Sequence, residues 1–477
     1  MSEKKDLNWD VAFLIFLVFL FLTKLLILYF LKLPLSFDEA YYWDWSRHLA
    51  FGYYSKPPMV AWLIRLSTWI FGNSEFAVRL PALLCMVLAS GFSYLLFKEL
   101  TDRKTAFFSA VFISLLPIIT IYSFVMTIDP PLIFFWILAT YFFVKYLKSR
   151  KAFFAILSGV TAGLALLSKQ TAAAFCFFGL VFSLLYLRNE PGCKLYLVTF
   201  VLIPFLVYLP NVFWNLKHGL LMLKHTESHF TRHEHNLKGF LNFFAGCIGA
   251  YTPFFVYLIG LGVGYLFSKT KSLILNFLYL EHLPFLLLVM SASLFIKMNV
   301  NWIFPFVIGG YFLALRSWES ELLSFSRLKK ALVKVSFAIG ILGSFLLVAL
   351  ALSPKHFPKT AQRLLSKFQG WKVLASKVSE SYDGRYPLVC GDRHIAAELA
   401  FYLKAHPEPY VANFSRVAKS QYDVWRKVTQ LAGKEVVFVG SGNNKPRFLK
   451  KAKLLRVVLV KLPYKVEVFS VWQGIIK

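Results

Sequence analysis

The sequence predicts a mainly α-helical, polytopic membrane protein that ends in a small α/β domain. Of its 477 residues, 58% are hydrophobic and only 16% are charged, a balance too apolar for an ordinary soluble protein. About eleven apolar runs are long enough to cross a hydrocarbon core of about 30 Å. These runs cover residues 11–33, 77–97, 105–125, 130–147, 152–168, 171–187, 194–213, 239–267, 283–297, 300–316 and 331–352.

Charged residues within or beside the apolar runs need an explanation in two places. Glu281 and His282 interrupt the apolar stretch that begins at Leu273, so residues 273–282 are expected to form an interfacial helix that leads into the ninth span. Lys24 lies inside the first span, where a long side chain can snorkel to the membrane surface.

Lys and Arg in short loops mark the cytoplasmic side of a membrane protein. With Met1 inside, the basic loops all fall in the cytoplasm: residues 98–104, 145–151, 269–271 and 327–330. An odd number of spans then places Ser353 and all later residues on the outer face, which is the periplasm for a bacterial inner membrane. We therefore expect a transmembrane domain over residues 1–352 and a periplasmic domain over 353–477.

The C-terminal 125 residues alternate short β-rich runs, such as "EVVFVG", with segments of helical period, such as "AAELAFYLKAH". This alternation predicts the small α/β domain. The segment carries 23 Lys and Arg against 8 Asp and Glu, but no zinc-finger, helix-turn-helix or RNA-binding pattern accompanies the charge. Attraction to the lipid bilayer is one expected use of the basic residues, and a merely solvated basic face is the alternative; no nucleic-acid partner is expected.

With this topology, the unusual polar residues gather at the outer ends of the helices. They fall in an outer loop over residues 34–76, in a second outer loop over 214–238, and at single positions beside the spans. The members are Asp38, Glu39, Arg47, Lys56, Arg79, Asp129, Lys169, Lys297 and a cluster of His, Lys, Arg and Glu in the second loop. Such a convergence predicts a functional site facing outward. Taken alone, Asp129 before Pro130 could be only a helix cap, and Lys169 could snorkel to the membrane surface.

The first outer loop contains "FDEAYYWDWSRHL" followed by "YYSKPP". Its aromatic residues recur at the spacing of an amphipathic helix, and Trp and Tyr favour the water–lipid boundary. The double proline fixes an extended backbone that would present Lys56 toward the acids Asp38 and Glu39. We expect a surface helix that carries these acids.

A carboxylate at a membrane surface could deprotonate a hydroxyl while nearby cations stabilise a departing phosphate. Nucleotide sugars and ATP are absent outside the cytoplasm, so an activated group must arrive on a lipid carrier. A membrane transporter or flippase of a lipid-linked sugar is the alternative. Transporters place polar sites near the bilayer midplane, often in paired repeats, whereas here the polar residues crowd one rim.

Several motifs occur in one order along the chain: "FDEAYYWDWSRHL", "YYSKPPMVAWLIRL", "EFAVRLPALL", "MTIDPPLIFFW", "GLALLSKQTA" and "NWIFPF". Over about residues 10–316 the sequence resembles the polyprenyl-phosphate-dependent glycosyltransferases of the GT-C superfamily. The resemblance is to the bacterial branch related to protein O-mannosyltransferases and to lipid A aminoarabinose transferases. It implies inverting transfer of a sugar from an undecaprenyl-phosphate donor to a periplasmic acceptor, which could be lipid A, lipopolysaccharide core, another glycan or a protein.

The resemblance also assigns roles to residues. Asp38 becomes the acid–base candidate, with Glu39 beside it and Asp129 as a further catalytic acid. Lys56 and Lys169 become candidate ligands of the donor phosphate, and Arg79 and Arg232 are expected to add positive charge there. Contacts to the substrates are expected from Tyr42, Tyr54, His225 and His229.

Two departures from the aminoarabinose transferases concern the metal and the sugar. Those enzymes usually carry Glu where Ser55 stands, as part of a metal site, and Arg where Tyr41 stands. A hexose or a uronic acid is therefore as compatible with the sequence as an aminosugar. His225, His229 and His233 recur every fourth residue, so one helical face could hold a divalent metal ion, or else be a polar surface over the site.

Overall fold

The computed structural model describes residues 7–188, 194–230, 237–266, 271–316 and 326–477. The chain divides into two compact units by its contacts. We call the first the helical unit; it comprises Met1–Tyr29, Lys56–Val60 and Arg79–Val348. The second, the sheet unit, comprises Phe30–Ser55, Ala61–Val78 and Ala349–Lys477.

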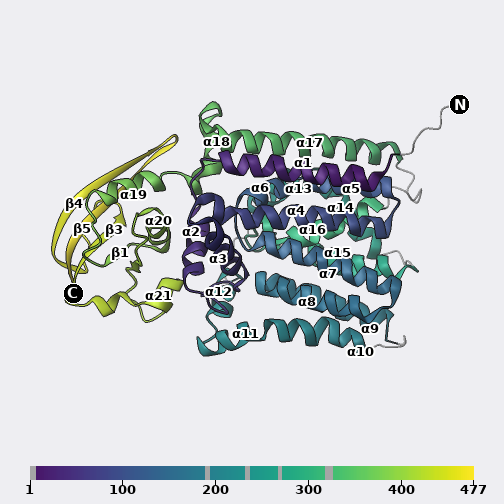
Figure 1. The fold of residues 1–477 in the computed structure, drawn as a ribbon, viewed down its shortest axis with the longest axis horizontal. Helices are drawn as coiled ribbons and strands as arrows, with labels where there is room; N and C mark the ends of the chain where they lie inside the picture. The colour runs from purple at the N-terminus through teal and green to yellow at the C-terminus, as the bar shows by residue number, and fades with distance from the viewer. Residues whose placement is uncertain (1–6, 189–193, 231–236, 267–270, 317–325) are drawn as a thin grey trace. The chain divides into compact units, whose positions relative to one another are not determined.

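The helical unit contains most of the apolar helices, and its long helices run roughly parallel to one another in Figure 1. Six helices of the described chain are long and apolar enough to cross a membrane. They are α1 (Trp9–Phe30), α4 (Glu75–Leu100), α7 (Asp129–Ser149), the continuous α10–η2–α11 segment (Lys194–Lys217), α15 (Leu273–Ala292) and α17 (Ser326–Leu352).

Two further candidate spans are bent pairs. The pair α5 (Arg103–Ser114) and α6 (Pro117–Phe124) bends by 59°, and the pair α13 (Leu237–Tyr251) and α14 (Phe254–Leu266) bends by 109°. Shorter apolar helices accompany them: α3 (Met59–Phe71), α8 (Ala152–Ser168), η1–α9 (Gln170–Tyr186) and α16 (Phe304–Arg316). The chain is a multi-pass membrane protein, as its composition predicts.

The prediction for the ninth span was wrong at its start. Residues 273–282 are not a separate interfacial helix, because α15 runs unbroken from Leu273 and ends at Ala292. Glu281 and His282 are completely buried within it. The ring of His282 occupies the space where a side chain at Gly309 would lie, so the absence of a side chain on α16 makes room for it.

Lys24 also differs from its prediction, because it does not snorkel. Its side chain is buried, and its Nζ donates a hydrogen bond to Ser123 Oγ at 2.9 Å. The hydroxyl on α6 therefore gives this amine a polar partner within the helical unit, which offsets part of the cost of burying it.

The C-terminal part of the sheet unit holds the predicted α/β fold. Its five strands lie in the order β2-β1-β3-β5-β4. The first three in that order are parallel, and β5 and β4 continue the sheet antiparallel. The strands are β1 (Leu388–Cys390), β2 (Tyr410–Val411), β3 (Glu435–Ser441), β4 (Leu449–Leu462) and β5 (Lys465–Ile476).

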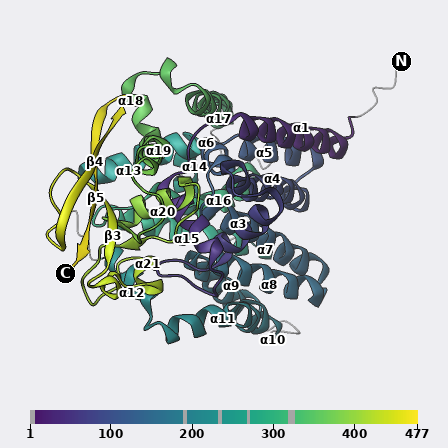
Figure 2. The same ribbon diagram turned by 60° about the vertical axis from the view of Figure 1, so that its left-hand side comes forward.

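Helices α19 (Trp371–Ser379) and α20 (Arg393–Tyr402) contact the sheet, and Figure 2 shows them beside its strands. Helix α2 (Phe37–Arg47), which comes from the first outer loop, packs in turn against α20. Short helices complete the unit: α18 (Lys359–Gln362), η5 (Arg363–Phe368), α21 (Gln421–Trp425) and η6 (Val428–Leu431). This packing joins residues near position 40 to residues near position 400.

Candidate active site

The helix expected in the first loop is present as α2, and a capping box starts it. Most of its side chains are buried, and its expected place along the membrane surface stays a prediction. Ser36 Oγ accepts a hydrogen bond from the Glu39 amide, and Glu39 Oε2 accepts one from the Ser36 amide at 2.9 Å. A reciprocal cap of this kind satisfies backbone donors at the first turn. Glu39 is fully buried, and its carboxylate has a structural role there as the second member of the cap.

The third acid of α2 also has a structural partner. Asp44 is 1% exposed and forms an ion pair with Arg47, one turn later. The Arg47 guanidinium also donates to the main-chain oxygens of His406 and Pro407. Arg47 therefore ties the end of α2 to the loop that follows α20.

Asp38 differs from both of these acids because a third of its side chain is exposed. Its Oδ1 accepts a hydrogen bond from Arg393 Nη1 at 3.3 Å. The same guanidinium lies over the ring of Tyr41, 5.1 Å from its centroid. Asp38 is thus the carboxylate of α2 that is both accessible and held in position.

Arg393 is a residue that the sequence analysis did not identify. It is the first residue of α20, and the N-cap of that helix is Asp392, whose carboxylate accepts from two backbone amides. The pair with Asp38 spans 355 positions, and no local motif marks it. Only the packing of α2 on α20 brings the two residues together.

The two candidate tyrosines lie in the sheet unit. Tyr42 is buried, with its ring 5.0 Å from that of Trp45. Tyr54 is half-buried, and its backbone amide donates to Gln421 Oε1 at 2.6 Å. Burial raises the pKa of the Tyr54 hydroxyl above its usual value, so this group stays protonated and can donate a hydrogen bond.

In the helical unit, the structure joins two predicted residues that are 40 positions apart. Lys169 Nζ lies 2.8 Å from Asp129 Oδ1. The other oxygen of Asp129 accepts from Asn301 Nδ2 at 3.0 Å. Both charged side chains are almost completely buried, at 2% exposure for Asp129 and 9% for Lys169. This arrangement is a buried ion pair with an amide partner, in place of the helix cap or the snorkelling lysine that each residue alone would suggest.

The backbone explains why these groups meet. Asp129 begins α7 and is followed by Pro130 and Pro131, which fit the first turn because they need no amide partner. Lys169 is an extended residue between α8 and η1. Asn301, within η3 (Val300–Trp302), was missed by the sequence analysis although it lies in the quoted "NWIFPF" motif.

Lys56 and Arg79 are the two other predicted phosphate ligands that the described part of the helical unit contains. Lys56 is half-buried before two buried prolines, and Arg79 is 1% exposed near the start of α4. Asp38 belongs to the sheet unit, whereas Lys56 and Asp129 belong to the helical unit. Their convergence on one cavity stays a prediction.

The histidine-rich loop is described only in part. His225 and His229 lie on α12 (Leu221–Phe230), four residues apart, whereas Arg232 and His233 fall outside the described residues. Among the residues that are described, no group of three His, Cys, Asp or Glu side chains could hold a metal ion. The three-histidine hypothesis thus stays untested, because its third member lies outside that set.

Comparisons with known proteins give a family match and several relatives. Residues 55–214 match the family described as dolichyl-phosphate-mannose-protein mannosyltransferase. The chain is 29% identical over 280 residues to the lipid A galacturonosyltransferase RgtD of Rhizobium johnstonii, a match that covers 58% of this chain and 59% of that protein. The aligned region therefore spans less than two thirds of that relative.

A second relative is the undecaprenyl phosphate-alpha-4-amino-4-deoxy-L-arabinose arabinosyl transferase of Yersinia enterocolitica. It is 30% identical over 141 residues, which cover 29% of this chain and 22% of that protein.

Among solved structures, ArnT from Cupriavidus metallidurans bound to undecaprenyl phosphate superposes with a TM-score of 0.67. The match covers 97% of this chain and 98% of that one, at 15% sequence identity. A superposition this close at such low sequence identity shows that the two proteins share a fold, and no more than that. The family match and the two curated relatives add sequence similarity to this shared fold, and together they make the chain similar to the polyprenyl-phosphate-dependent glycosyltransferases of the GT-C superfamily.

Proposed function

We propose that the protein transfers a sugar from an undecaprenyl-phosphate donor to a glycolipid acceptor, with inversion at the anomeric carbon. The observation that carries this proposal is the similarity to two curated transferases, one named for lipid A and one for an undecaprenyl-phosphate sugar. No relative reported above is named as a transporter or a flippase, so transfer is the function that the comparisons support.

Asp38 is the proposed general base. Its carboxylate takes the proton of the acceptor hydroxyl, the oxygen attacks C1 of the donor sugar, and the bond from C1 to the phosphate oxygen breaks. Undecaprenyl phosphate leaves with the bonding electrons, and Asp38 later returns the proton to water. The exposure of this carboxylate and its anchor on Arg393 support the role.

Positive charge is needed where the phosphate departs. Lys56, Arg79 and Lys169 are the proposed sources within the described chain, with Arg232 as a further candidate outside it. Asp129 holds Lys169 at a fixed position through the 2.8 Å ion pair, so its proposed role is to orient that amine. Glu39 keeps a proposed supporting role, since its cap fixes the turn that carries Asp38.

The proposed location is the bacterial inner membrane, with Met1 in the cytoplasm and the C-terminal residues in the periplasm. The basic loops that follow the positive-inside rule support this orientation. Among the sugars left open by the sequence, a hexuronic acid is favoured, because the relative with the longest alignment of the two reported is named a galacturonosyltransferase. Lipid A is the proposed acceptor.

The test uses full-length protein in lipid nanodiscs with undecaprenyl-phosphate galacturonic acid and purified lipid A. Mass spectrometry should detect lipid A heavier by one hexuronic acid, and NMR of the product should show an inverted anomeric centre. Envelope glycolipids of a strain that lacks the gene should lose the same sugar. Glycolipids and glycoproteins identical to those of the parent strain would contradict the proposal.

A further inference from the structure

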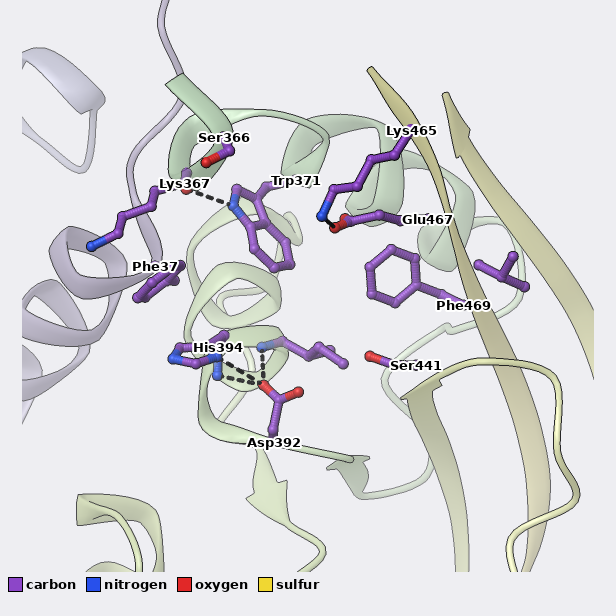
Figure 3. Close-up of a pocket in the computed structure, with 12 residues that line it drawn as sticks. Phe37, Ser366, Lys367, Trp371, Asp392, His394, Ser441, Lys465, Glu467 and Phe469 are labelled. Atoms are coloured by element: carbon purple, nitrogen blue, oxygen red, sulfur yellow. Dashed lines mark hydrogen bonds and ion pairs between the residues drawn. The ribbon is translucent and has the colours of Figure 1, made fainter. Parts of the chain in front are cut away.

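A pocket of about 450 Å³ lies entirely within the sheet unit (Figure 3). Its walls come from separate elements: the first residue of α2, the segment from η5 to α19, the start of α20, the end of β3 and the start of β5. Small-molecule sites typically have volumes of about 300–1,000 Å³. The pocket is therefore large enough for a sugar or a short glycan.

Aromatic rings form much of this pocket. Phe37, Trp371 and Phe469 all line it. In the view of Figure 3, the indole ring of Trp371 lies between the rings of Phe37 and Phe469. The indole N–H of Trp371 donates to the Lys367 carbonyl oxygen at 3.0 Å, which fixes the orientation of the ring. A fixed, partly exposed aromatic face suits the apolar face of a pyranose ring.

Polar groups surround these rings. Lys465 and Glu467 form an ion pair on β5, and Asp392 and His394 stand at the start of α20. Ser441 adds an exposed hydroxyl for which the described residues provide no side-chain hydrogen bond. Donors and acceptors around an aromatic platform match the hydroxyl groups of a sugar, whereas a site for a purely apolar ligand would lack them.

The pocket shares its walls with the anchor of the proposed base. Phe37 directly precedes Asp38, and His394 directly follows Arg393, the partner of Asp38. The ring centroids of Phe37 and His394 are 4.1 Å apart. The starts of α2 and α20 therefore line the pocket and also position the carboxylate, although Asp38 and Arg393 themselves do not line it.

We propose that this pocket binds the saccharide part of the acceptor. The inference rests on the proposed function and adds an acceptor site to it. The pocket is favoured for the acceptor over the donor for two reasons. The described candidate ligands of the donor phosphate all belong to the helical unit, and the base that takes the acceptor proton belongs to the sheet unit.

The test measures binding by isothermal titration calorimetry with full-length protein in nanodiscs. The acceptor probe is the deacylated glucosamine disaccharide bisphosphate of lipid A, and the donor-side probe is undecaprenyl phosphate. Trp371→Ala removes the platform, and Ser441→Phe fills the pocket without removing a buried side chain. Both variants should weaken disaccharide binding at least tenfold and leave undecaprenyl phosphate binding unchanged.

Ser376→Phe is the matched control, because Ser376 is exposed on α19 and does not line the pocket. This control variant should bind the disaccharide as the wild type does. Three results would overturn the inference. The Ser441→Phe variant could bind the disaccharide normally, the Ser441→Phe variant could lose undecaprenyl phosphate binding and keep disaccharide binding, or the wild type could fail to bind the disaccharide. Asp38→Asn separates the two proposals: it should bind the disaccharide normally while failing to transfer, and normal transfer by it would count against the proposed function alone.

Discussion

Lys169 Nζ lies 2.8 Å from Asp129 Oδ1, and both side chains are nearly inaccessible to solvent. A charge buried at this depth is costly unless an opposite charge accompanies it. The pair therefore constrains the end of α8 and the start of α7 to stay together, with Asn301 as a third partner.

Lys169→Met should destabilise the protein strongly, by about 3–5 kcal/mol, because it leaves the Asp129 carboxylate buried without its cation. The double variant Asp129→Asn/Lys169→Met should recover much of this loss. Thermal unfolding in detergent measures both effects. Equal destabilisation by the single and the double variant would show that the two charges are not coupled.

A surface pair supplies the control for that experiment. Lys377 and Glu380 form an ion pair at 2.9 Å in which both side chains are well exposed. Because exposed pairs contribute only about 0–1 kcal/mol, Lys377→Met should shift the unfolding temperature little. A shift as large as that of Lys169→Met would argue against burial as the cause.

Arg393→Ala should lower kcat by about tenfold to a hundredfold, because the Asp38 carboxylate loses the group that orients it. Arg393→Lys retains a positive charge near Asp38 and should keep more of the activity. Both variants should bind undecaprenyl phosphate with the affinity of the wild type. A variant that had lost its structure would bind undecaprenyl phosphate more weakly. A fall in donor affinity with unchanged kcat would contradict this positioning role.

His394 should make the sheet unit sensitive to acid. Burial lowers the pKa of its imidazole from the usual 6.5, the Arg393 guanidinium and Lys367 lower it further, and the carboxylates of Asp392 and Asp38 oppose them. The unfolded chain therefore takes up a proton near pH 6.5, whereas the folded protein does so only at lower pH. Stability should be full above pH 6.5 and fall as the pH drops below that value.

Thermal unfolding at a series of pH values checks this expectation. His394→Gln should flatten the decline below pH 6.5, while His356→Gln, at an exposed position, should leave the wild-type profile unchanged. An identical decline in the His394→Gln variant would assign the acid sensitivity to other groups.

Gly309→Ala should destabilise the helical unit. An added Cβ would lie 1.9 Å from a ring atom of His282, which is completely buried, so the ring would have to shift. Overpacking of this kind typically costs about 1–3 kcal/mol. Gly260→Ala is the control, because nothing lies within 4 Å of the Cβ that it adds. Alanine has a higher helix propensity than glycine, so this substitution should be neutral or stabilising. Equal unfolding temperatures for the two variants would contradict the close approach.

The sequence predicted the elements whose causes are local. Helix α2 follows from the helical spacing of the aromatic residues in "DEAYYWDW", and strand β3 follows from the β-rich run "EVVFVG". Long-range contacts were beyond its reach, because the partner of Asp38 is 355 positions away and no motif links the two.

Burial was the other quantity that sequence alone could not supply. Glu281 and His282 looked like a break in an apolar run, yet α15 continues through them because α16 offers a glycine at the facing position. Likewise, Asp129 and Lys169 each fitted a simple local explanation until the packing of α7 and α8 joined them.

The central claim is that Asp38 performs the proton transfer in a glycosyl transfer reaction. Single-turnover transfer from undecaprenyl-phosphate galacturonic acid to lipid A, compared between the wild type and Asp38→Asn, tests it most directly. The account predicts a rate at least about a hundredfold lower in the variant, with an unchanged unfolding temperature and unchanged undecaprenyl phosphate affinity. Transfer by Asp38→Asn at the wild-type rate would contradict the account.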